Sequence, residues 1–218
     1  MKKFDLTTVY NEKRPLSWSG ISSFQWNKRQ WYEKYVLKIL PEVTPELRFG
    51  SMVDKKIQDD PKYLPNVIRY SVLQHEMRAM WNGIPLLGFA DAHEPSIPAI
   101  RDYKTGRKPW DKKRADETGQ LTMYLFMEYL KNRKLKPEAY ELYIDWLPTH
   151  IKDGEIAFIE PNHKILVPKT FKTKRTMSQI LTFGKLIEDT WAEMEAYASR
   201  DHGAPHVKVA KPLSKFLK

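Results

Sequence analysis

Residues 84–104 read IPLLGFADAHEPSIPAIRDYK and contain two apolar segments with a Pro-containing turn between them. The segments predict two consecutive strands, the first over Ile84 to His93 and the second over Ile97 to Lys104. Directly before them, Asn82-Gly83 is a strong signal for a two-residue hairpin turn, so Tyr70 to Trp81 is predicted to be the preceding strand. The sequence therefore predicts a three-stranded antiparallel meander.

Helices are predicted on both sides of this meander. Ser17 to Ile39 has the pattern of one or two helices, Glu46 to Asp60 that of another, and Asp111 to Asn132 that of a long one. The remaining predicted elements are a strand over Tyr140–Leu147, a hairpin of Glu155–Ile159 with Lys164–Val167, and a helix over Met177–Arg200. This order predicts an α/β fold with a mixed central sheet flanked by helices, an N-terminal helical segment, and a C-terminal hairpin plus long helix.

The length of 218 residues fits one domain better than two. We expect a single domain over residues 1–200, with its core in residues 16–147 and a hairpin and helix extension in residues 148–200. Residues 201–218 are polar, basic and Pro-containing, and are predicted to form a basic C-terminal tail.

The composition excludes several classes of protein and of site. The chain has no cysteine, which rules out disulfides, thiolate zinc sites, iron–sulfur clusters and a cysteine nucleophile. No apolar run approaches the ~20 residues that a membrane span needs. The N-terminus lacks the apolar stretch of a secretory signal. We therefore expect an intracellular protein without a membrane partner. A cytoplasmic location in a protein of bacterial or phage origin is a separate expectation.

Basic residues exceed acidic residues by 37 to 27, and the formal net charge is +10. The excess is concentrated in three segments. Residues 101–114 contain seven bases and two acids, residues 161–187 contain six bases and no acid, and residues 202–218 contain four lysines and no acid. This clustering predicts a polyanionic partner that contacts particular surfaces, and a merely solubilising surface is the alternative.

Aromatic and basic residues alternate in the first helical segment, where Trp26, Trp31 and Tyr32 are interleaved with Lys28, Arg29 and Lys34. Such an alternation is typical of surfaces on which nucleic-acid bases stack. Helical spacing predicts core positions for Phe24, Trp31 and Tyr35. The stacking interpretation therefore applies mainly to Trp18, Trp26 and the basic residues.

Two aspartates and a lysine of the meander form the sharpest chemical pattern. Asp102 and Lys104 are two residues apart in a predicted strand, so their side chains share a face. If the strands pair as a meander, Asp91 can lie beside Asp102, which would present two oxygen ligands to a cation such as Mg²⁺. Lys104 could then position a water or stabilise charge on phosphorus. Asp-x-Lys alone is weak evidence, because it also occurs at Asp54–Lys56, Asp60–Lys62 and Asp111–Lys113.

The ordered set Gly88-x-x-Asp91, Asp102-x-Lys104 and Gln120-x-x-x-Tyr124 resembles the PD-(D/E)xK nuclease superfamily. It is most similar to the RecB-type branch, which includes the RecB nuclease domain, the CRISPR adaptation nucleases and the mitochondrial genome maintenance exonuclease. Upstream, residues 16–35 resemble the helical opening of that branch, and Phe49-Gly50-Ser-Met-Val53-Asp54 resembles its first catalytic motif. The resemblance covers roughly residues 16–147 and implies a restriction-endonuclease-like core.

The resemblance also implies roles for individual residues. Asp91, Asp102, Lys104, Gln120 and Tyr124 would be the catalytic set. Asp54, Asp91 and Asp102, with the carbonyl of Tyr103, would bind Mg²⁺ or Mn²⁺. Residues predicted to bind nucleic acid are Arg107, Lys108, Lys112, Lys113, Arg114, Lys172, Lys174 and Arg175.

Three positions depart from the family pattern or leave it open. The family's first motif commonly has His where this chain has Asp54, which can still hold a metal directly or through water. Asn27-Lys28 stands where the iron–sulfur members have Cys-Pro. Glu76 resembles a recurrent acidic position of the branch, with a cross-strand ion pair to a lysine as the alternative.

The predicted function is that of a metal-dependent deoxyribonuclease, with the family favouring an exonuclease acting on DNA ends in recombination, repair or replication. Its partner would be DNA, either single-stranded or at duplex ends. Two alternatives stay open. One is a nucleic-acid-binding module that has kept the fold and lost cleavage. The other is a nuclease subunit that needs a recombination or replication partner for activity.

Overall fold

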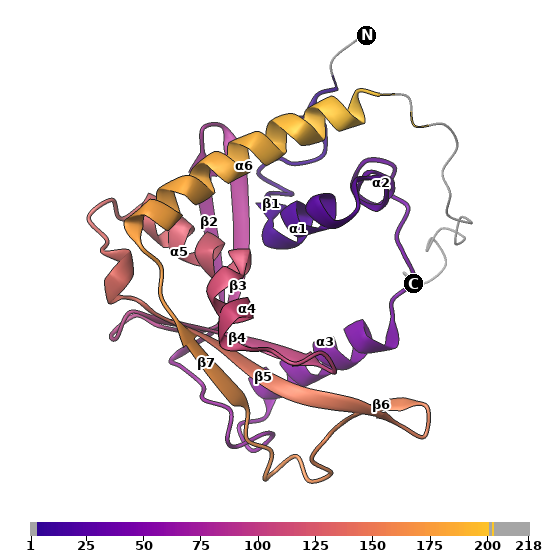
Figure 1. Cartoon of the computed structure of the whole chain (residues 1–218), viewed down its shortest axis with the longest axis vertical. Coiled ribbons are helices and arrows are strands. Elements are labelled where there is room, and N and C mark those ends of the chain that lie inside the picture. The colour runs from indigo at the N-terminus through magenta and orange to yellow at the C-terminus, as the bar shows by residue number, and fades with distance from the viewer. Residues whose placement is uncertain (1–3, 201, 203–218) are drawn as a thin grey trace. The chain divides into compact units, whose positions relative to one another are not determined.

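The computed structural model describes residues 4–200 and residue 202 (Figure 1). The chain divides into two compact units, which are described separately below. The first contains residues 1–42, 80–86 and 184–218, and the second contains residues 43–79 and 87–183. A single domain over residues 1–200 stays a prediction, and the predicted tail lies outside the described residues except for His202. No helix in the described part is long and apolar enough to cross a membrane.

The second unit is built on a mixed six-stranded sheet. Its strands are β2 (Val72–Trp81), β3 (Ile84–Glu94), β4 (Ala99–Gly106), β5 (Glu141–Lys152), β6 (Glu155–Phe158) and β7 (Lys169–Thr173). Strand β4 pairs antiparallel with β3 and parallel with β5, while β6 and β7 both pair antiparallel with β5 (Figure 1). The turn of the β2–β3 hairpin belongs to the first unit. The predicted α/β class with a mixed sheet is confirmed.

The predicted Asn82-Gly83 turn is present, with φ of 45° and 80° at these residues. Both values lie in the left-handed region that a two-residue hairpin turn requires and that Gly tolerates without a Cβ penalty. A second such turn occurs at Asp153-Gly154, where φ is 52° and 81°. It joins β5 to β6, and Thr149 pairs with Phe158 in that hairpin.

The predicted hairpin of 155–159 with 164–167 is therefore wrong. Strand β6 pairs with the end of β5, and residues 164–167 form no strand. They are held instead by the side-chain amide of Asn66, which donates to the carbonyls of Lys164 at 3.4 Å and Leu166 at 3.2 Å. The Asp153-Gly154 turn depends only on neighbouring residues. Residues 164–167, in contrast, are held by Asn66, about a hundred positions earlier in the chain.

The single long helix predicted over residues 111–132 is also wrong. Helix α4 (Lys112–Glu117) and helix α5 (Gly119–Lys131) are separated by Thr118, whose φ of −64° and ψ of 121° are extended. The guanidinium of Arg175 donates to the carbonyls of Ala115 at 3.2 Å and Thr118 at 3.0 Å. These bonds satisfy carbonyls that the end of α4 leaves without helical partners. Together, α4 and α5 form the crossover that two parallel strands need.

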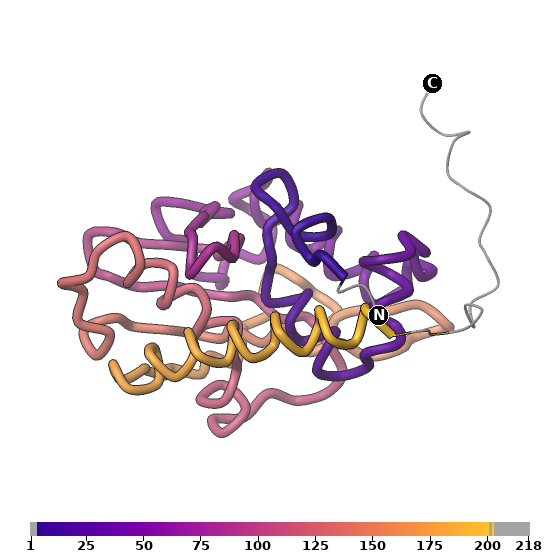
Figure 2. The backbone as a smooth tube through the Cα atoms, turned by 90° about the horizontal axis from the view of Figure 1, so that it is seen from above, coloured from indigo at the N-terminus to yellow at the C-terminus, as the bar shows by residue number. Residues whose placement is uncertain are grey.

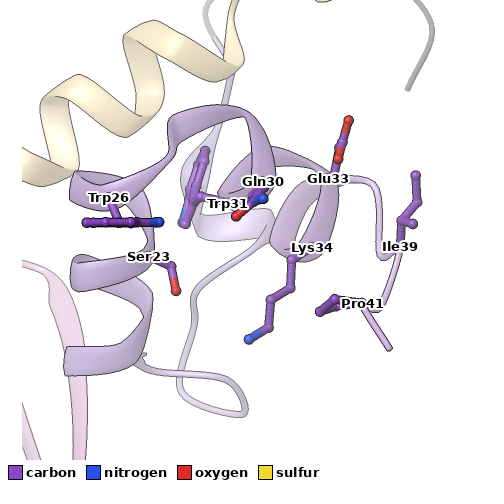
Figure 3. A pocket seen from close by; sticks show the side chains of 8 residues that line it. All are labelled: Ser23, Trp26, Gln30, Trp31, Glu33, Lys34, Ile39 and Pro41. Atoms are coloured by element: carbon purple, nitrogen blue, oxygen red, sulfur yellow. The ribbon is translucent and has the colours of Figure 1, made fainter. Parts of the chain in front are cut away.

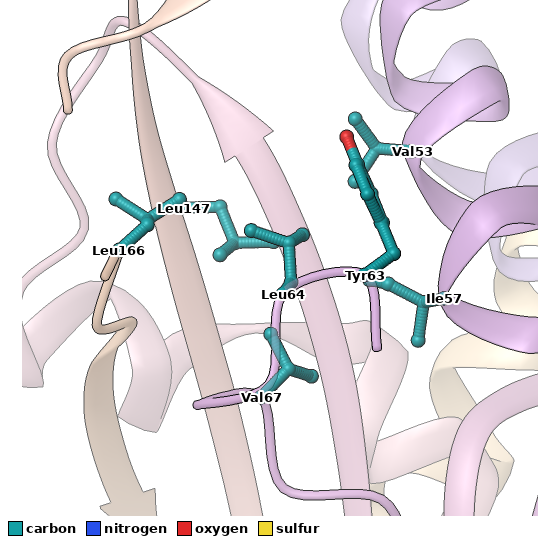
Figure 4. Packing of buried hydrophobic residues seen from close by; sticks show 7 residues of the cluster. All are labelled: Val53, Ile57, Tyr63, Leu64, Val67, Leu147 and Leu166. Carbon is teal, nitrogen blue, oxygen red and sulfur yellow. The ribbon is translucent and has the colours of Figure 1, made fainter. Parts of the chain in front are cut away.

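Helix α3 (Pro45–Asp59) packs its apolar side on the sheet of the second unit. The hydroxyl of Thr44 caps its first turn by accepting from the backbone N–H of Leu47 at 3.2 Å. A buried cluster joins two α3 residues to β5 and the loops around it; its members are Val53, Ile57, Tyr63, Leu64, Val67, Leu147 and Leu166 (Figure 4). This packing fixes the position of Asp54, the residue after Val53.

Short elements complete the second unit and begin the first. They are a 3-10 turn over Pro137–Ala139, a 3-10 turn over Leu6–Thr8, and the two-residue strand β1 (Leu16–Ser17). Helix α6 (Met177–Ala198) starts in the second unit, continues in the first, and runs without a break (Figure 2).

In the first unit, β1 is followed by helices α1 (Trp18–Trp26) and α2 (Lys28–Trp31) and by a π-helical turn over Tyr32–Val36. Ser17 and Asn27 cap the two helices through their side-chain oxygens, as expected for these residue types. Trp31 is fully buried and donates to the Tyr10 hydroxyl at 3.0 Å. Its ring meets Phe24 edge to face at 5.0 Å, so core positions for Phe24 and Trp31 are confirmed.

Candidate active site

The two meander aspartates lie beside each other, just beyond a regular part of the sheet. The β3–β4 register pairs Ala92 with Arg101, and Asp91 and Asp102 are the next residues outward. Near this point the backbone N–H of Tyr103 donates to Asp91 Oδ2 at 2.6 Å. The carboxylate of Asp91 is thereby held against β4, as the meander predicted.

Asp102 and Lys104 share a face of β4, as their spacing predicted. The side chain of Asp102 is 1% exposed, and its Oδ2 lies 2.6 Å from Lys104 Nζ. The Lys104 side chain is 28% exposed. The result is an ion pair between a buried carboxylate and a lysine whose side chain is partly exposed.

Helix α5 supplies the next two predicted residues. Lys104 Nζ donates to Gln120 Oε1 at 2.8 Å, and Gln120 Nε2 donates to the Tyr124 hydroxyl at 2.6 Å. That hydroxyl donates in turn to the carbonyl of Phe89 at 2.6 Å, with Asp102 Oδ1 as a more distant acceptor at 3.5 Å. A continuous chain of hydrogen bonds therefore runs from the Lys104 ammonium through α5 to β3.

Gly88 allows α5 to approach β3 closely enough to make these bonds. A Cβ at this position would lie 2.5 Å from Met127 Cε and 2.9 Å from Tyr124 Cε1. Both distances are shorter than van der Waals contact, so any side chain there would push the Tyr124 ring away. This is the physical reason for glycine in the Gly88-x-x-Asp91 pattern.

Asp54 reaches the site from α3, where Gln74 of β2 links it to Asp91. The side-chain amide of Gln74 donates to Asp54 Oδ1 at 3.0 Å and to Asp91 Oδ1 at 3.1 Å. Gln58, one turn further along α3, also donates to Asp54 Oδ2, at 3.1 Å. Asp54 therefore lies near Asp91 and is more than a solvated helix residue, while its predicted role as a metal ligand stays a prediction.

Sequence reasoning missed Gln74 and weighed Glu76 instead. Glu76 is half-exposed and pairs with Arg78 on its own strand, so the cross-strand ion pair with a lysine is wrong. Its likeness to an acidic position of the family stays a prediction. Strict strand alternation would give Gln74 the same face as Glu76. Gln74 has a φ of 48°, which interrupts the alternation. No signal in the sequence marks that interruption.

Tyr103 lies between the two key residues of β4. Its ring packs against the α3 cluster and its hydroxyl donates to the carbonyl of Ile68 at 2.8 Å, so a core position is confirmed. Metal binding by its carbonyl stays a prediction.

Burial and crowding of like charges shift the acidities in the site. Burial, reinforced by the charge of Asp102, raises the pKa of Asp91 to about 8. Burial also raises the pKa of Asp102, although Lys104 opposes the effect, and burial raises that of Asp54. Burial alone would lower the pKa of Lys104, but the charges of Asp102 and Asp91 outweigh it and raise that pKa. Lys104 is therefore an ammonium at neutral pH, while the carboxyl groups compete for protons.

These residues line an open pocket of about 210 Å³ within the second unit. Its lining comprises Gly50, Val53, Asp54, Ile57, Asp91, Asp102, Tyr103, Lys104, Thr105 and Gln120. Close approach of α3 to β4 shapes one wall, since a Cβ at Gly50 would lie 3.1 Å from the Thr105 hydroxyl. Perturbed acids in an open, polar pocket are typical of a catalytic or metal-binding site.

The donor chemistry of the pocket fits a hard cation. Among the described residues, no three Asp, Glu or His side chains already converge as a metal site. The Gln74 amide nitrogen, however, lies within 3.1 Å of oxygens from both Asp54 and Asp91. Carboxylate oxygens are ligands that Mg²⁺ prefers, so Asp54 and Asp91 could hold such an ion in place of their hydrogen bonds to Gln74.

The predicted nucleic-acid-binding residues have varied surroundings. Lys108 is exposed, and the Arg114 guanidinium lies 4.0 Å above the Trp110 ring. The others have local acidic or carbonyl partners: Arg107 with Glu46, Lys112 with Asp116, Lys113 with Glu117, Lys172 with Glu141, and Lys174 with the Glu138 carbonyl. Exposed pairs of this kind are weak, so these cations stay available to a phosphate.

Arg175 is the exception. Its side chain is buried, with 2% exposure for the residue, and it donates to Thr122 Oγ1 and Thr173 Oγ1 at 2.7 Å each, besides the carbonyls at the end of α4. A guanidinium so enclosed does not reach a phosphate. The predicted role in nucleic-acid binding is corrected to a structural one, because tertiary packing, which a charge count does not show, encloses this base.

Comparison with known proteins gives a likeness of fold. No protein-family model matches the chain, and no curated protein is significantly similar to it. The crystal structure of a "Putative exonuclease" from Eubacterium rectale has a TM-score of 0.54 and 14% identity, covering 91% of this chain and 87% of that one. The structure of SSO0001, with a TM-score of 0.38 and 14% identity over 80% of this chain and 70% of that one, is too distant to support an argument. The chain therefore shares its fold with the Eubacterium rectale protein, and a shared fold alone does not determine an activity.

Proposed function

We propose that this protein is a metal-dependent nuclease that hydrolyses phosphodiester bonds in DNA. The observation that carries the proposal is the buried Asp102–Lys104 ion pair next to Asp91 and Asp54 in an open pocket. Burial raises the pKa of all three carboxyl groups, and the charges of neighbouring carboxylates raise these pKa values further, against the opposing effect of the Lys104 ammonium. A divalent cation would remove this conflict of like charges and let all three ionise.

Asp54, Asp91 and Asp102 are the residues that would hold Mg²⁺ or Mn²⁺. Such an ion lowers the pKa of a bound water and polarises a phosphate. The three aspartates come from different elements, α3, β3 and β4, so the fold determines how they converge. The Gln74 amide donates to Asp54 and Asp91, so it would compete with a cation for these two carboxylates.

Lys104 would act as a fixed positive charge. Because its pKa is raised by the neighbouring carboxylates, it holds its proton and cannot serve as a general base at neutral pH. An ammonium in the pocket can instead donate to a phosphate oxygen and stabilise the charge that develops there. Gln120 would orient it, and Tyr124 would anchor Gln120 through the hydrogen bonds described above.

We further propose action on DNA ends, as an exonuclease in recombination, repair or replication. The name of the structurally similar Eubacterium rectale protein supports this choice, as does the sequence resemblance. The exposed basic side chains near α4 and β7 support an anionic polymer as the partner. The intracellular location inferred from the sequence stays a prediction.

One observation favours a second candidate, a nucleic-acid-binding protein that does not cleave alone. The Gln74 amide already donates to one oxygen of Asp54 and one of Asp91, and Lys104 forms an ion pair with Asp102. If these bonds outcompete a metal, the protein would bind DNA without hydrolysis, or would need a partner to open the site.

Cleavage of end-labelled linear DNA, single- and double-stranded, with closed circular DNA as a further substrate, tests the proposal. We expect cleavage with Mn²⁺ or Mg²⁺, none with EDTA, and no attack on closed circles. Asp102→Asn should lower turnover at least about 100-fold while the protein stays folded, with a melting temperature in EDTA at neutral pH no lower than that of the unmodified protein. Asp60→Asn, in an exposed copy of the same Asp-x-Lys spacing, is the matched control and should stay within about twofold of the unmodified protein.

Normal turnover of Asp102→Asn at saturating metal would contradict the proposed catalytic site. DNA binding without cleavage under any metal condition would favour the second candidate. Cleavage that appears only when a cell extract is added would favour a partner-activated subunit.

A further inference from the structure

A second pocket lies wholly within the first unit, in the helical segment that follows β1. Its volume is about 280 Å³, and the residues important here are Ser23, Trp26, Gln30, Trp31 and Lys34. Ser23 and Trp26 come from α1, while Lys34 projects from the π-helical turn into the space between the helices (Figure 3). The nuclease site proposed above uses none of these residues.

Two tryptophans of this pocket differ sharply in exposure. Trp31 is 0% exposed and is fixed by its hydrogen bond to Tyr10 and its contact with Phe24. Trp26 is 88% exposed, the most exposed of the large hydrophobic residues in the described part of the chain. An indole in water forgoes the burial that normally holds aromatic residues in place. Because the exposed Trp26 indole lies beside a pocket, it is suited to stack on a flat ligand.

The wall opposite Trp26 is built by unusual backbone. The Tyr32–Val36 turn is π-helical, with the N–H of Leu37 donating to the Tyr32 carbonyl at 3.0 Å. Lys38 follows with φ of 61°, a left-handed conformation that is uncommon for a residue with a side chain. It lets Ile39 and Pro41 return to line the pocket. Single π-helical turns and such backbone conformations occur frequently at functional sites.

Among the lining residues, the exposed charge is positive. The one acidic lining residue, Glu33, has a side chain that is 4% exposed, and Arg29 neutralises it at 2.9 Å. Lys34 has no carboxylate partner among the described residues, and its ammonium lies 4.9 Å from the Tyr35 ring. The Gln30 amide and the Ser23 hydroxyl add neutral hydrogen-bonding groups. An anionic ligand with a flat aromatic part complements this combination.

We propose that this pocket binds single-stranded nucleic acid, with a base stacked on Trp26 and a phosphate near Lys34. The proposal rests on the proposed function for its choice of a polynucleotide. Base–aromatic stacking tolerates any base, because every base has a π-face, and each stacked base contributes appreciably to binding. The pocket would thus add affinity without selecting a sequence.

The test measures binding in EDTA, where no cleavage can occur, by fluorescence anisotropy. The probes are a short labelled oligo(dT) and an abasic strand of the same length, which has the phosphates and no bases. Trp26→Ala should weaken oligo(dT) binding by roughly five- to a hundredfold and leave abasic binding unchanged. Trp26→Phe, which keeps an aromatic face, should retain most of the affinity. Lys34→Ala should weaken binding of both strands.

Two matched controls lie in the same unit. Met80→Ala removes a half-exposed apolar side chain outside the pocket, and Lys13→Ala removes an exposed lysine outside it. Met80→Ala should leave both affinities unchanged. Lys13→Ala should cost less than Lys34→Ala. Equal oligo(dT) affinity of Trp26→Ala and the unmodified protein, or an equal loss on the abasic strand, would overturn the proposal.

The same measurements distinguish other occupants of the pocket, and they show whether the pocket proposal or the nuclease proposal has failed. If residues 203–218 fill the pocket, Trp26→Ala will lower the melting temperature of the full chain but not that of a chain ending at residue 202. In that case Trp26→Ala will not weaken oligo(dT) binding, and this result also overturns the proposal. A protein that never cleaves DNA but shows the expected binding pattern supports the pocket and contradicts only the nuclease proposal. Normal cleavage with unchanged binding by Trp26→Ala contradicts only the pocket.

Discussion

Asp102-x-Lys104 and Asp60-x-Lys62 have the same spacing and almost nothing else in common. On β4 the two side chains form an ion pair at 2.6 Å, and the Asp102 side chain is 1% exposed. After α3, both residues are exposed, and Asp60 Oδ1 accepts a hydrogen bond from the backbone N–H of Lys62 at 2.9 Å. The Asp60 carboxylate therefore stabilises a turn, which is a common role for Asp, and the Lys62 side chain stays in solvent.

The difference shows what turns a short pattern into a site. Strand alternation places Asp102 and Lys104 on one face, and burial then makes their charges strong. Neighbouring elements add Asp91, Asp54 and Gln120. The spacing is necessary for this arrangement, but the buried position on a paired strand supplies the chemistry.

The largest expected effect comes from removing the Lys104 ammonium. Lys104→Ala should lower kcat for DNA cleavage by about 100-fold or more, because a positioned donor to the phosphate is lost. Lys62→Ala, at the exposed copy, should leave kcat within about twofold. Steady-state kinetics at saturating Mn²⁺ measure both variants. Equal losses of kcat in Lys104→Ala and Lys62→Ala would mean that burial of the Asp-x-Lys pair does not matter for catalysis.

A smaller loss is expected from Gly88→Ala, which changes no charged group. The added methyl collides with Met127 and the Tyr124 ring, and such overpacking costs about 1–3 kcal/mol of stability. Displacing Tyr124 should also loosen Gln120 and lower kcat by about tenfold. Gly106→Ala on β4 is the control, since a Cβ there meets nothing within 4 Å. Thermal unfolding and steady-state kinetics of both variants check this prediction. A Gly88→Ala variant with unchanged stability and kcat would show that the close approach of α5 to β3 is not needed.

Asp91→Asn should change the pH dependence of stability in the metal-free protein. The folded-state pKa of Asp91 is raised to about 8, above an unfolded value of about 3.9, so the folded state binds more protons between these limits. Its ionisation therefore destabilises the fold progressively as pH rises from about 4 to 8. The variant should match the unmodified protein near pH 4 and melt several degrees higher above pH 8.

Melting curves in EDTA across that pH range measure the effect, with Asp60→Asn as the exposed control. The raised pKa values of Asp54 and Asp102 act in the same direction and leave the variant some residual slope. A melting temperature of Asp91→Asn that follows the unmodified protein at every pH would contradict the electrostatic account.

The smallest effect is expected at another copy of the spacing, Asp111-x-Lys113. Asp111 caps α4 by accepting from the Arg114 N–H at 2.7 Å, and the Lys113 side chain is 82% exposed. If Lys113 contacts a phosphate, Lys113→Ala should weaken single-strand binding a few-fold for any sequence and reduce the log–log salt slope by about 0.7. Glu117→Gln removes its ion-pair partner, keeps the cation, and should not weaken binding. A sequence-dependent loss would contradict a simple phosphate contact.

Much of the architecture could be predicted from local signals. Asn82-Gly83 predicted its hairpin because left-handed conformations are accessible to these residue types, and the period-two pattern predicted β2, β3 and β4. The same alternation predicted that Asp102 and Lys104 would meet. The i, i+4 spacing likewise predicted that Gln120 and Tyr124 would point together.

The errors occurred where a distant residue overrides a local pattern. Helical periodicity continues through Thr118, but Arg175 takes the carbonyls at that point and α4 ends. Arg175 in turn belongs to a basic segment, and only packing shows that it is buried. Gln74 joined the site because its backbone leaves the regular strand conformation.

The sequence by itself determined which residues could do chemistry and which neighbours along the chain would share a face. Those properties depend on residue type, turn preference and the repeats of helix and strand, all of which act over a few positions. The tertiary structure alone decided that Asp54, Asp91 and Asp102 meet, that Gln74 lies between two of them, and that burial raises their pKa values. Charges interact strongly only at short range and out of water, and those conditions arise when distant segments pack together.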